Sequence, residues 1–572
     1  MNIIIVESPG KVQKIQSILG AKWKVAASVG HVRDLPEKSL GVSLPDFKPE
    51  YQPTERGKAV LKRLAAWIKT ADAVYLATDP DREGEAIAWH LADALKLKKP
   101  LRVTFGSITK SAIEPAIKAP RSLDMALVSA QEARRILDRL CGYLVSGSLS
   151  KAAGERLSAG RVQSPALRLV VDREREIRNF TSTTHYGAEL LFDGWKAAWV
   201  TKPWLPDGSE FLTDKALAEK AASLRSLLVI DCSETQSCSA PPAPFTTSSL
   251  QQAASNALRF SPKETMAIAQ KLYEAGRVTY MRTDSPNLSD EAVKEIRAYA
   301  KVQDLPLADK PRVWKSKEGA QEAHEAVRPT HIEVEEAGET DNEKALYRLI
   351  RIRALASQLA DAVYAVRVLR LGTDLGGKTA EFEARGRTLV EPGWRTVLFA
   401  DDAADEGESE PENPVPSLKK GTSATALDGK LLTKKTKPPT RYTEASLVRE
   451  LENRGIGRPA TYAAIVETIL RRAYVRMERR QLVPTPLGDK AVALLAGAFS
   501  FLDYGFTKNM EDSLDAVAKG ASRSRDILAK AYERLQGELS AFASAFGTEK
   551  GQKTSQEKTN TGNGKPAFGG KK

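Results

Sequence analysis

Residues 277–285 read R-V-T-Y-M-R-T-D-S, which places a tyrosine and an arginine two positions apart. In an extended segment the side chains alternate between faces, so Val278, Tyr280 and Arg282 face one way and the intervening residues face the other. A phenol can attack phosphorus, and a guanidinium can bind the non-bridging oxygens of a phosphate. An isolated Y-x-R is more typical of an ordinary strand, so the phosphate hypothesis depends on the rest of the chain.

The flanks of this stretch offer further groups. A helical pattern covers 248–275, after a proline-rich hinge at 241–244. Downstream, residues 321–329 read Q-E-A-H-E-A-V-R-P and supply His324 and Arg328 as groups that could reach a phosphate.

The chain begins with a strand that ends in charged residues. Ile3–Val6 is a short apolar run typical of a buried strand, and E-S-P-G-K follows at 7–11 before a helical pattern. Open α/β sheets bind ligands at the carboxyl ends of their strands. Glu7 and Lys11 are therefore expected at a ligand-binding edge.

A second buried strand, 73–77, also ends in acids. The sequence T-D-P-D-R-E-G-E follows at 78–85 and contributes Asp79, Asp81 and Glu83 near the start of the next helix. Acids at a helix N-terminus also complement the helix dipole, which is the alternative explanation. Because two strand ends terminate in acids, we favour a Mg²⁺ site formed by Glu7, Asp79, Asp81 and Glu83.

Basic residues follow on a predicted helix over 129–145. Arg135 and Arg139 are four positions apart and share a face. The helix leads to a small-residue segment, L-S-A-G-R-V-Q-S at 157–164, where backbone could approach a nucleic-acid strand. A glycine-rich turn at 454–462, R-G-I-G-R-P-A-T-Y, places Arg458 and Thr461 at a helix start as a phosphate cradle.

One motif is misleading. Residues 372–379, G-T-D-L-G-G-K-T, match the P-loop expression, yet the residues after Thr379 alternate as a strand does. We therefore predict a hairpin turn at Gly376-Gly377 and no nucleotide site there.

Composition indicates a soluble, basic, multidomain protein. The 572 residues are 42% hydrophobic and carry 86 Lys and Arg against 73 Asp and Glu, a net charge of +13. This charge favours a polyanionic partner. Cys141, Cys232 and Cys238 form neither a disulfide framework nor a zinc pattern. With no apolar run long enough for a membrane span and no room for a signal peptide before the first strand, we expect a cytoplasmic protein.

Taken together and in order, seven motifs resemble the type IA DNA topoisomerases, and most closely the core of bacterial DNA topoisomerase I. The motifs are I-V-E-S-P-G-K, S-V-G-H-V-R-D-L-P, T-D-P-D-R-E-G-E-A-I-A-W-H, S-A-G-R-V-Q-S, G-R-V-T-Y-M-R-T-D-S, Q-E-A-H-E-A-V-R-P and R-G-I-G-R-P-A-T-Y. The resemblance extends from Ile3 to about Ala545.

The resemblance implies roles for individual residues. Tyr280 is the nucleophile that joins the 5′ phosphate of a cleaved strand, Arg282 binds that phosphate, Lys11 helps the transition state and Glu7 assists proton transfer. The metal ligands are Glu7, Asp79, Asp81 and Glu83. The implied DNA contacts are His31, Arg134, Arg135, Arg139, Tyr143, Lys151, Ser158, Ala159, Gly160, Arg161, Val162, Gln163, Arg282, His324, Arg458 and Thr461, with Arg135 and Tyr143 forming a base pocket.

The resemblance also implies a fold that combines α/β and α+β parts. The expected fold is a toroidal core with an N-terminal Toprim α/β domain, helical domains and a strand-rich arch. The expected divisions are 1–130 (Toprim), 131–180 (helical, first part), 181–244 (arch, first part), 245–363 (tyrosine domain), 364–440 (arch, second part), 441–546 (helical, second part) and 547–572 (disordered basic tail).

The implied function is ATP-independent relaxation of negatively supercoiled DNA by strand cleavage, strand passage and resealing. The implied cofactor is Mg²⁺. ATP is not expected, because the phosphotyrosine link stores the phosphodiester bond and resealing then needs no nucleotide. Zinc is not expected, because no cysteine follows Cys238 to form the zinc ribbons that many bacterial relatives carry. The expected partner is DNA with a single-stranded region as cleavage substrate, bound by a monomer without membrane attachment. A Toprim nuclease or primase, and a noncatalytic single-strand DNA-binding protein, are the alternatives.

Overall fold

The computed structural model describes residues 1–316, 325–398 and 413–559 of the chain. The chain forms two compact units that interleave in sequence. Unit 1 consists of residues 1–172, 261–276 and 442–572, and unit 2 consists of residues 173–260 and 277–441. The chain therefore crosses between the units four times.

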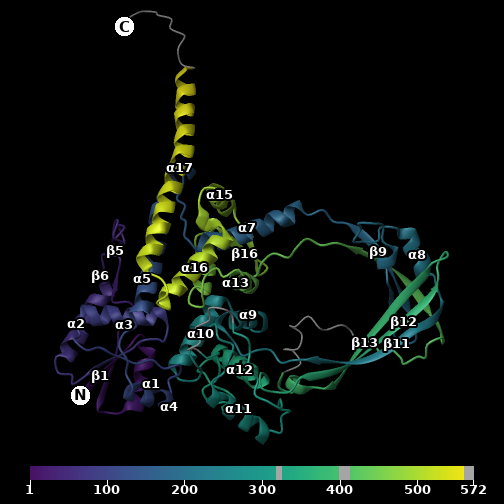
Figure 1. Cartoon of the computed structure of the whole chain (residues 1–572), viewed down its shortest axis with the longest axis horizontal. Coiled ribbons are helices and arrows are strands. Elements are labelled where there is room, and N and C mark those ends of the chain that lie inside the picture. Colours follow the sequence, from purple (N-terminus) through teal and green to yellow (C-terminus); the bar gives the residue numbers. More distant parts are fainter. Residues whose placement is uncertain (317–324, 399–412, 560–572) are drawn as a thin grey trace, which may run out of the picture. The chain divides into compact units, whose positions relative to one another are not determined.

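The N-terminal part of unit 1 is built on a parallel sheet with the strand order β2-β1-β7-β8 (Figure 1). Its strands are β1 (Asn2–Val6), β2 (Trp23–Ala27), β7 (Val74–Ala77) and β8 (Leu101–Arg102), and its helices are α1 (Gly10–Leu19), α2 (Glu55–Ile68), α3 (Arg82–Ala94) and α4 (Lys110–Lys118). Two short ribbons pair β3 (Arg33–Asp34) with β6 (Gln52–Pro53), and β4 (Val42–Ser43) with β5 (Lys48–Pro49). The inner strand β1 is fully buried from Ile3 to Val6, as its continuous apolar run predicts.

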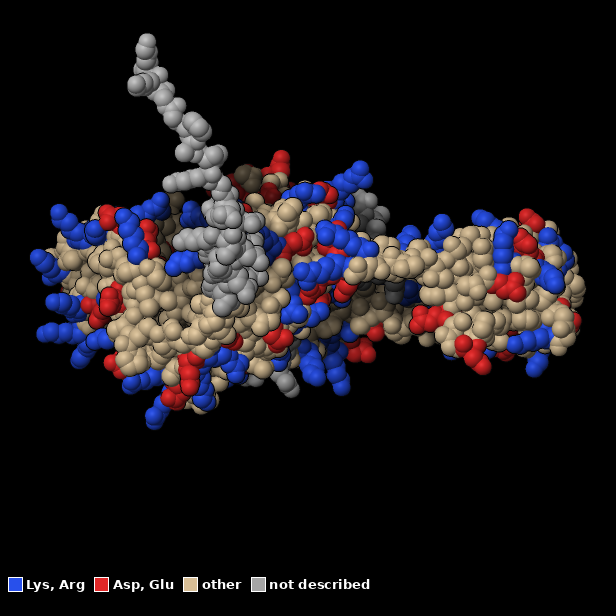
Figure 2. All heavy atoms as spheres, turned by 90° about the horizontal axis from the view of Figure 1, so that it is seen from above, with Lys and Arg blue, Asp and Glu red and all other residues tan. Residues whose placement is uncertain are grey.

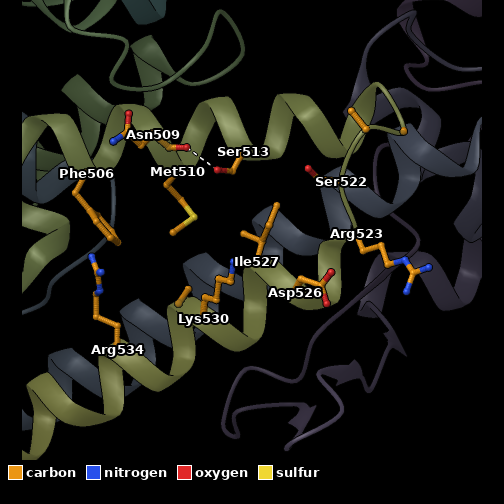
Figure 3. Close-up of a pocket in the computed structure, with 13 residues that line it drawn as sticks. Phe506, Asn509, Met510, Ser513, Ser522, Arg523, Asp526, Ile527, Lys530 and Arg534 are labelled. Carbon is orange, nitrogen blue, oxygen red and sulfur yellow. Dashed lines mark hydrogen bonds between the residues drawn. The ribbon is translucent and has the colours of Figure 1, made fainter.

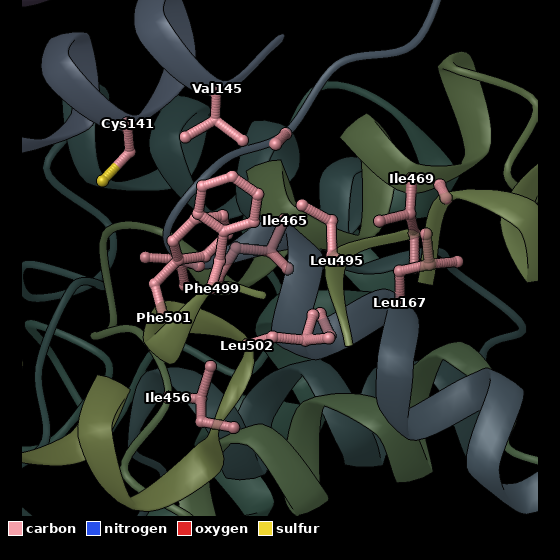
Figure 4. Close-up of a cluster of buried hydrophobic side chains, with 14 of the residues drawn as sticks. Cys141, Val145, Leu167, Ile456, Ile465, Ile469, Leu495, Phe499, Phe501 and Leu502 are labelled. Atoms are coloured by element: carbon pink, nitrogen blue, oxygen red, sulfur yellow. The ribbon is translucent and has the colours of Figure 1, made fainter. Parts of the chain in front are cut away.

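The rest of unit 1 is mainly helical. Its elements are α5 (Met125–Leu140), a π-helical turn (Cys141–Val145), α6 (Ser146–Ala153), α7 (Gln163–Asn179, which runs into unit 2), α10 (Pro262–Glu274), α13 (Glu444–Asn453), α14 (Tyr462–Arg471), β16 (Val475–Glu478), β17 (Gln481–Pro484), α15 (Pro486–Leu495), a 3-10 turn (Ser500–Leu502), α16 (Tyr504–Ala518) and α17 (Ser524–Thr559). One apolar cluster joins the early and late segments, and Figure 4 shows Val145 and Leu167 with Ile465, Phe499 and Phe501 in it. The first and last parts of the chain thus share one core.

Unit 2 contains a seven-stranded antiparallel sheet with the order β14-β11-β12-β13-β10-β9-β15. The strands are β9 (Thr184–Leu191), β10 (Lys196–Trp199), β11 (Ser226–Ser239), β12 (Ala362–Asp374), β13 (Thr379–Glu391), β14 (Ser423–Thr425) and β15 (Asp428–Lys435). The long strands β11, β12 and β13 are visibly twisted in Figure 1. Helix α8 (Lys215–Ala222) contributes to the apolar core of this sheet.

The helices of unit 2 other than α8 are α9 (Thr247–Ala257), α11 (Asp290–Val302) and α12 (Asp341–Ala356), and 3-10 turns occur at Lys202–Trp204 and Gly393–Val397. A separate apolar cluster packs α11 and α12 against Trp394 and the start of β12. Among the described residues, no helix has both the length and the apolar character that crossing a bilayer requires.

The P-loop lookalike is a hairpin, as predicted. Strands β12 and β13 pair Asp374 with Thr379, and Gly376 and Gly377 both have positive φ angles of 68° and 88°. This conformation is the one that glycine adopts without strain. Thr379 begins a strand, so no helix follows the motif.

The predicted fold class is confirmed, while several element boundaries differ. The helix expected over 129–145 ends at Leu140 and continues as the π-helical turn. The helical block at 248–275 is two helices, of which α9 belongs to unit 2 and α10 to unit 1. Helix α17 continues to Thr559 into the predicted tail, where glutamine, glutamate and lysine have good helix propensity. Residues 560–572 lie outside the described part.

Candidate functional site

The acidic residues of unit 1 lie at the carboxyl ends of adjacent parallel strands. Strands β1 and β7 pair Val6 with Ala77, so Glu7 and the 78–81 loop follow at the same edge of the sheet. Asp81 caps α3, where its Oδ1 accepts a hydrogen bond from Gly84 N at 2.8 Å. The sequence prediction that the two strand ends place their acids together is confirmed.

The close contact between this loop and α3 requires a glycine. A Cβ at Gly84 would lie 2.1 Å from the carbonyl oxygen of Asp79, and this backbone oxygen cannot rotate away as a flexible side chain can. We expect Gly84→Ala to lower the free energy of unfolding by about 1–3 kcal/mol, as overpacking does, and to displace the acidic loop. Urea denaturation measures the loss of stability.

Gly147 provides the matched control for this prediction. It lies in α6, and a Cβ added there meets no atom within 4 Å. Gly147→Ala should be neutral or stabilise the chain by up to about 1 kcal/mol, because alanine has the higher helix propensity. Equal effects of the two substitutions would contradict the packing argument.

Lys11 and Asp79 form a buried ion pair beside the acidic edge. Their side chains are 1% and 4% exposed, and Lys11 comes from the first turn of α1. The Lys11 ammonium also lies 5.1 Å from the ring centroid of Tyr273, a buried residue of α10. Burial, followed by the charges of Asp79 and Glu7, raises the pKa of Tyr273 well above its ordinary value. The Tyr273 phenol therefore stays neutral, and its ring lies beside the Lys11 ammonium.

Glu7 has the most perturbed carboxyl group of this site. The pKa of Glu7 rises to about 8. Burial is the main cause, the negative charges of Asp79 and the other nearby acids raise the pKa further, and the positive charge of Lys11 opposes the rise. Its Oε2 atom is buried and lacks a hydrogen-bond partner among the described residues. In the absence of a cation, Glu7 is thus protonated at neutral pH. Its carboxyl group can act as a proton donor or, once ionised, as a ligand of a cation.

The donor set fits a hard cation that retains water. Carboxylate oxygens are the ligands that Mg²⁺ takes in proteins, usually one or two of them together with waters and substrate phosphate. Within the described residues, no group of three or more His, Cys, Asp or Glu side chains is arranged so that it could hold a metal ion by itself. Asp79 pairs with Lys11, and Glu83 lies 3.7 Å from His31 Nε2. The orphaned Glu7 oxygen is the observation that fits an incoming cation.

A buried carboxylate on α16 joins several predicted DNA-binding arginines. Glu511 is fully buried, its Oε1 accepts from Arg161 Nη1 at 2.7 Å, and its Oε2 pairs with Arg134. One turn later, Asp515 accepts from Arg458 Nη2 at 2.7 Å. The three arginines come from α5, from the segment before α7 and from the turn before α14. The structure therefore brings them together around α16.

These charges strongly affect Glu511. Burial alone would raise its pKa, but the charges of Arg134, Arg161 and Arg458 together lower it to about 2. Arg161 also donates from Nε to Asp138 at 3.0 Å, while its buried Nη2 has no partner among the described residues. One guanidinium nitrogen of this buried side chain thus lacks a hydrogen-bond acceptor.

The pKa of Glu511 predicts a loss of stability in acid. The folded-state pKa of about 2 lies below the ordinary 4.5, so the stabilisation is fully present above pH 4.5 and is lost as the pH falls toward 2. The difference corresponds to about 3 kcal/mol. Urea denaturation at pH 5 and pH 3 should show about 2 kcal/mol of this loss in the wild-type chain, since pH 3 still lies above the folded-state pKa, and a smaller loss in Glu511→Gln. An identical acid dependence in both proteins would contradict the assignment.

Arg135, Arg139 and Tyr143 form a second row, on one face of α5 and the π-helical turn. Arg135 binds Asp34 through two hydrogen bonds, of 3.0 Å from Nε and 2.9 Å from Nη2. Arg139 and Tyr143 each donate at 3.4 Å to backbone oxygens in the loop after Asp34. Tyr143 is 46% exposed. The predicted shared face of Arg135 and Arg139 is confirmed, and an exposed phenol lies at its end.

The small-residue segment before α7 is held mainly by protein groups. Ser158 N donates to Tyr474 at 2.7 Å, Ala159 N donates to Ser146 at 3.0 Å, and Gly160 N donates to Ser164 at 3.1 Å. A Cβ at Gly160 would overlap the side chain of Gln163, 1.6 Å away. Val162 is buried, and Lys151 is exposed at the end of α6. Contact of this segment with DNA stays a prediction.

The glycine-rich turn before α14 closes on itself. Thr461 Oγ1 accepts from Arg458 N and donates to Arg458 O, both at 2.9 Å. Gly457 has a φ of 85°, which only glycine adopts readily. The turn therefore fixes the backbone of Arg458, whose side chain is 21% exposed.

The Tyr280 segment belongs to unit 2 and is clamped from two sides. Val278 forms an isolated bridge with Pro329, and Thr279 N donates to Arg328 O at 2.9 Å. From the other side, Thr247 Oγ1 donates to Met281 O at 2.7 Å. The segment is thus a fixed connection between these contacts, and the regular strand assumed from the sequence does not form.

Burial within this segment is nearly complete. Tyr280 is 4% exposed, its neighbours Thr279 and Met281 are 0% and 1% exposed, and Arg282 is half-buried. Both faces are therefore covered, and Arg282 is more accessible than Tyr280. His324, the other predicted group near this sequence, lies outside the described residues.

Sequence reasoning missed Glu511, Asp515 and Tyr273. One signal for Glu511 was available, because it lies on the α16 face that also carries Thr507 and Leu514, both fully buried. A charged residue on such a face needs a partner. Tyr273 carries no sequence signal that separates it from an ordinary core residue of α10.

Comparisons with known proteins agree with this geometry. The Toprim domain model matches residues 2–108, and the DNA topoisomerase model matches residues 122–529, which include Tyr280. A plasmid DNA topoisomerase I from Xylella fastidiosa is 53% identical over 553 residues, which cover 95% of this chain and 84% of that protein. The full-length topoisomerase I structure from Thermotoga maritima matches with a TM-score of 0.84 at 36% identity, covering 94% of this chain and 90% of that one.

The topoisomerase match extends well beyond the Toprim domain, so a Toprim nuclease or primase does not account for it. The chain therefore belongs to the type IA DNA topoisomerase family, the ATP-independent isomerases that include bacterial topoisomerase I.

Proposed function

We propose that this chain relaxes negatively supercoiled DNA by cleaving one strand with Tyr280, passing a strand through the gap and resealing the break. The observation that carries this proposal is the clamped Tyr280 segment, in which hydrogen bonds with 326–330 and with Thr247 fix the backbone that carries Tyr280 and Arg282. A fixed nucleophile next to a permanently charged phosphate ligand suits transesterification.

In the proposed step, the Tyr280 phenol gives up its proton to solvent, its oxygen forms a bond to phosphorus, and the bond from phosphorus to the 3′ oxygen breaks. The 5′ phosphate is then linked to tyrosine, and the leaving 3′ oxygen takes up a proton. Resealing is the reverse reaction, so the phosphodiester energy is conserved and no nucleotide is consumed.

Unit 1 supplies the proposed assisting groups. While no cation is bound, burial and the neighbouring acids raise the pKa of Glu7 to about 8, which suits protonation of the leaving oxygen. When Glu7 is a ligand of the cation, it is ionised and does not carry this proton. Lys11 is held by Asp79 and supplies positive charge for the transition state.

Glu7, Asp79, Asp81 and Glu83 are the residues that would hold Mg²⁺. The cation would supply positive charge that offsets the acids and the DNA phosphates. Relaxation should therefore stop when EDTA removes the cation and resume when Mg²⁺ is restored.

The proposed DNA contacts are the residues that the family motifs imply. They are His31, Arg134, Arg135, Arg139, Tyr143, Lys151, Arg161, Gln163, Arg458 and Thr461, with the backbone of 158–162, and His324 by sequence motif. We place the protein in the cytoplasm as a monomer, with single-stranded DNA as the cleaved substrate and with neither zinc nor ATP as cofactor.

The test combines plasmid relaxation with trapping of the covalent intermediate. A labelled single-stranded oligonucleotide is incubated with the wild-type chain and Mg²⁺, and the reaction is stopped with denaturant. We expect relaxation, and a 5′-linked peptide that mass spectrometry assigns to Tyr280. A 3′ link or another attached residue would contradict the proposal. Nicking without any adduct would favour a nuclease, and binding without cleavage would favour a noncatalytic DNA-binding protein.

A further inference from the structure

Helices α16 and α17 enclose an open groove of about 820 Å³ on unit 1. Figure 3 shows the two helices on opposite sides of this groove, with side chains from both turned into it. The groove contains none of the seven family motifs, and part of its α17 wall, including Lys530 and Arg534, lies beyond the match to the topoisomerase model. Its role therefore needs a separate explanation.

The floor of the groove is apolar. Phe506 and Met510 lie one turn apart on α16, and Ile527 and Ala531 lie one turn apart on α17. All four are partly exposed and pack against the main apolar cluster of unit 1. The floor thus offers an accessible aromatic ring and accessible aliphatic side chains, which are supported by the packed core of unit 1.

The rim of the groove is basic. Arg523, Lys530 and Arg534 line it and are exposed, and within the described residues none of them forms a salt bridge. The one acid of the lining, Asp526, lies in the first turn of α17, where a carboxylate complements the helix dipole. Three cations and one carboxylate leave a formal charge of +2.

Cations near the groove but outside its lining behave differently. Lys508 pairs with Asp512 at 3.1 Å, and Arg525 pairs with Asp46 at 2.7 Å. Figure 2 likewise shows Lys and Arg spread over the visible face with Asp and Glu among them, so positive charge as such does not mark a site. The unpaired rim above an apolar floor is what distinguishes the groove.

Further groups match the faces and edges of bases. The guanidinium of Arg534 lies 5.2 Å from the ring centroid of Phe506. A base in the groove could stack on this ring and contact the guanidinium at the same time. Asn509 is exposed at the groove and carries both a donor and an acceptor, as a base edge requires.

We propose that this groove is an accessory binding site for single-stranded DNA, formed by residues other than the DNA contacts proposed above. Bases would stack on Phe506 and Met510 while phosphates pair with Arg523, Lys530 and Arg534. An acidic peptide shares the charge requirement but makes less use of the aromatic ring and the amide. The inference rests on the proposed function, because it takes single-stranded DNA as the substrate.

Photo-cross-linking tests the proposal. The probe is a 20-nucleotide oligothymidylate with 5-iodouracil substitutions, irradiated with the full chain and mapped by mass spectrometry. We expect a cross-link at Phe506 or Met510, with a yield that falls at least about tenfold in the triple variant Arg523→Gln, Lys530→Gln, Arg534→Gln. The slope of log affinity against log salt should decrease in magnitude by about 2, since each single-strand phosphate contact contributes about 0.7.

The matched control is the triple variant Lys508→Gln, Lys519→Gln, Arg525→Gln, which removes the same charge from α16, from the residue that follows it and from α17, all outside the groove lining. It should retain the cross-link. Equal losses in both variants, or cross-links only elsewhere, would overturn the proposal. Binding of a labelled acidic peptide in the groove without any DNA cross-link would also overturn it, in favour of a protein partner.

The covalent assay separates this inference from the proposed function. The groove variant should still form the Tyr280 adduct with a short oligonucleotide. A wild-type chain that cross-links at the groove and forms no adduct would contradict the cleavage mechanism and leave the accessory site standing.

Discussion

Tyr280→Phe should abolish plasmid relaxation and the 5′-linked intermediate while leaving single-strand binding within about twofold of wild type. The substitution removes one oxygen from a side chain that is 4% exposed, and the backbone contacts of its neighbours remain. Such a volume-conserving change has a small effect on packing. The loss of activity would thus report the missing nucleophile. Relaxation assays, adduct trapping and oligonucleotide binding measure the three quantities.

Tyr364→Phe is the matched control. Tyr364 is also a buried tyrosine of unit 2, 8% exposed, and it lies on β12 away from the proposed chemistry. This variant should relax DNA at the wild-type rate. The mechanism is wrong if Tyr280→Phe still yields a 5′-linked protein.

Glu511→Gln should lower the free energy of unfolding by about 3–5 kcal/mol, the usual cost of removing one partner from a buried ion pair. The side chain is fully buried, and its two oxygens bind Arg161 and Arg134. An amide leaves these guanidinium charges uncompensated and turns a donor toward one of them. Urea denaturation measures the loss, and single-strand binding should weaken because the arginines lose their fixed orientation.

Asp512→Asn is the control for this prediction. Asp512 is the next residue on α16, is 50% exposed and pairs with Lys508 and Arg458. An exposed pair contributes about 0–1 kcal/mol, so this variant should retain nearly all its stability. Comparable losses from the two substitutions would show that Glu511 does not organise the arginines.

The position of the acids at the strand ends could be predicted from sequence, because it depends on residues that lie next to them in the chain. Glu7 and Asp79 each follow an apolar strand, and parallel neighbours end at the same edge of a sheet. The hairpin at Gly376 followed from the alternation after Thr379 in the same way. In both cases the deciding residues lie within a few positions of the feature.

The arginine arrangement could not be predicted in this way. Arg134 and Arg135 are adjacent in sequence, yet helix geometry turns them toward different partners, Glu511 and Asp34. The Arg134 and Glu511 positions are 377 residues apart. Likewise, the helical pattern at 248–275 is continuous in sequence, and only packing assigns α10 to unit 1 and α9 to unit 2. Long-range packing determines these features.

The interleaved composition of unit 1 has a consequence for synthesis on the ribosome. The apolar face of α5 packs in a cluster whose other members include residues of α13 to α17, and these follow Tyr442. At a synthesis rate of about 5–20 residues per second, the apolar face of α5 stays without these packing partners for on the order of a minute. The nascent chain therefore exposes apolar helix surface long before release, and unit 1 matures only after translation is nearly complete. Chaperone binding during this interval should matter more for this protein than for one whose domains are each encoded by a single continuous segment.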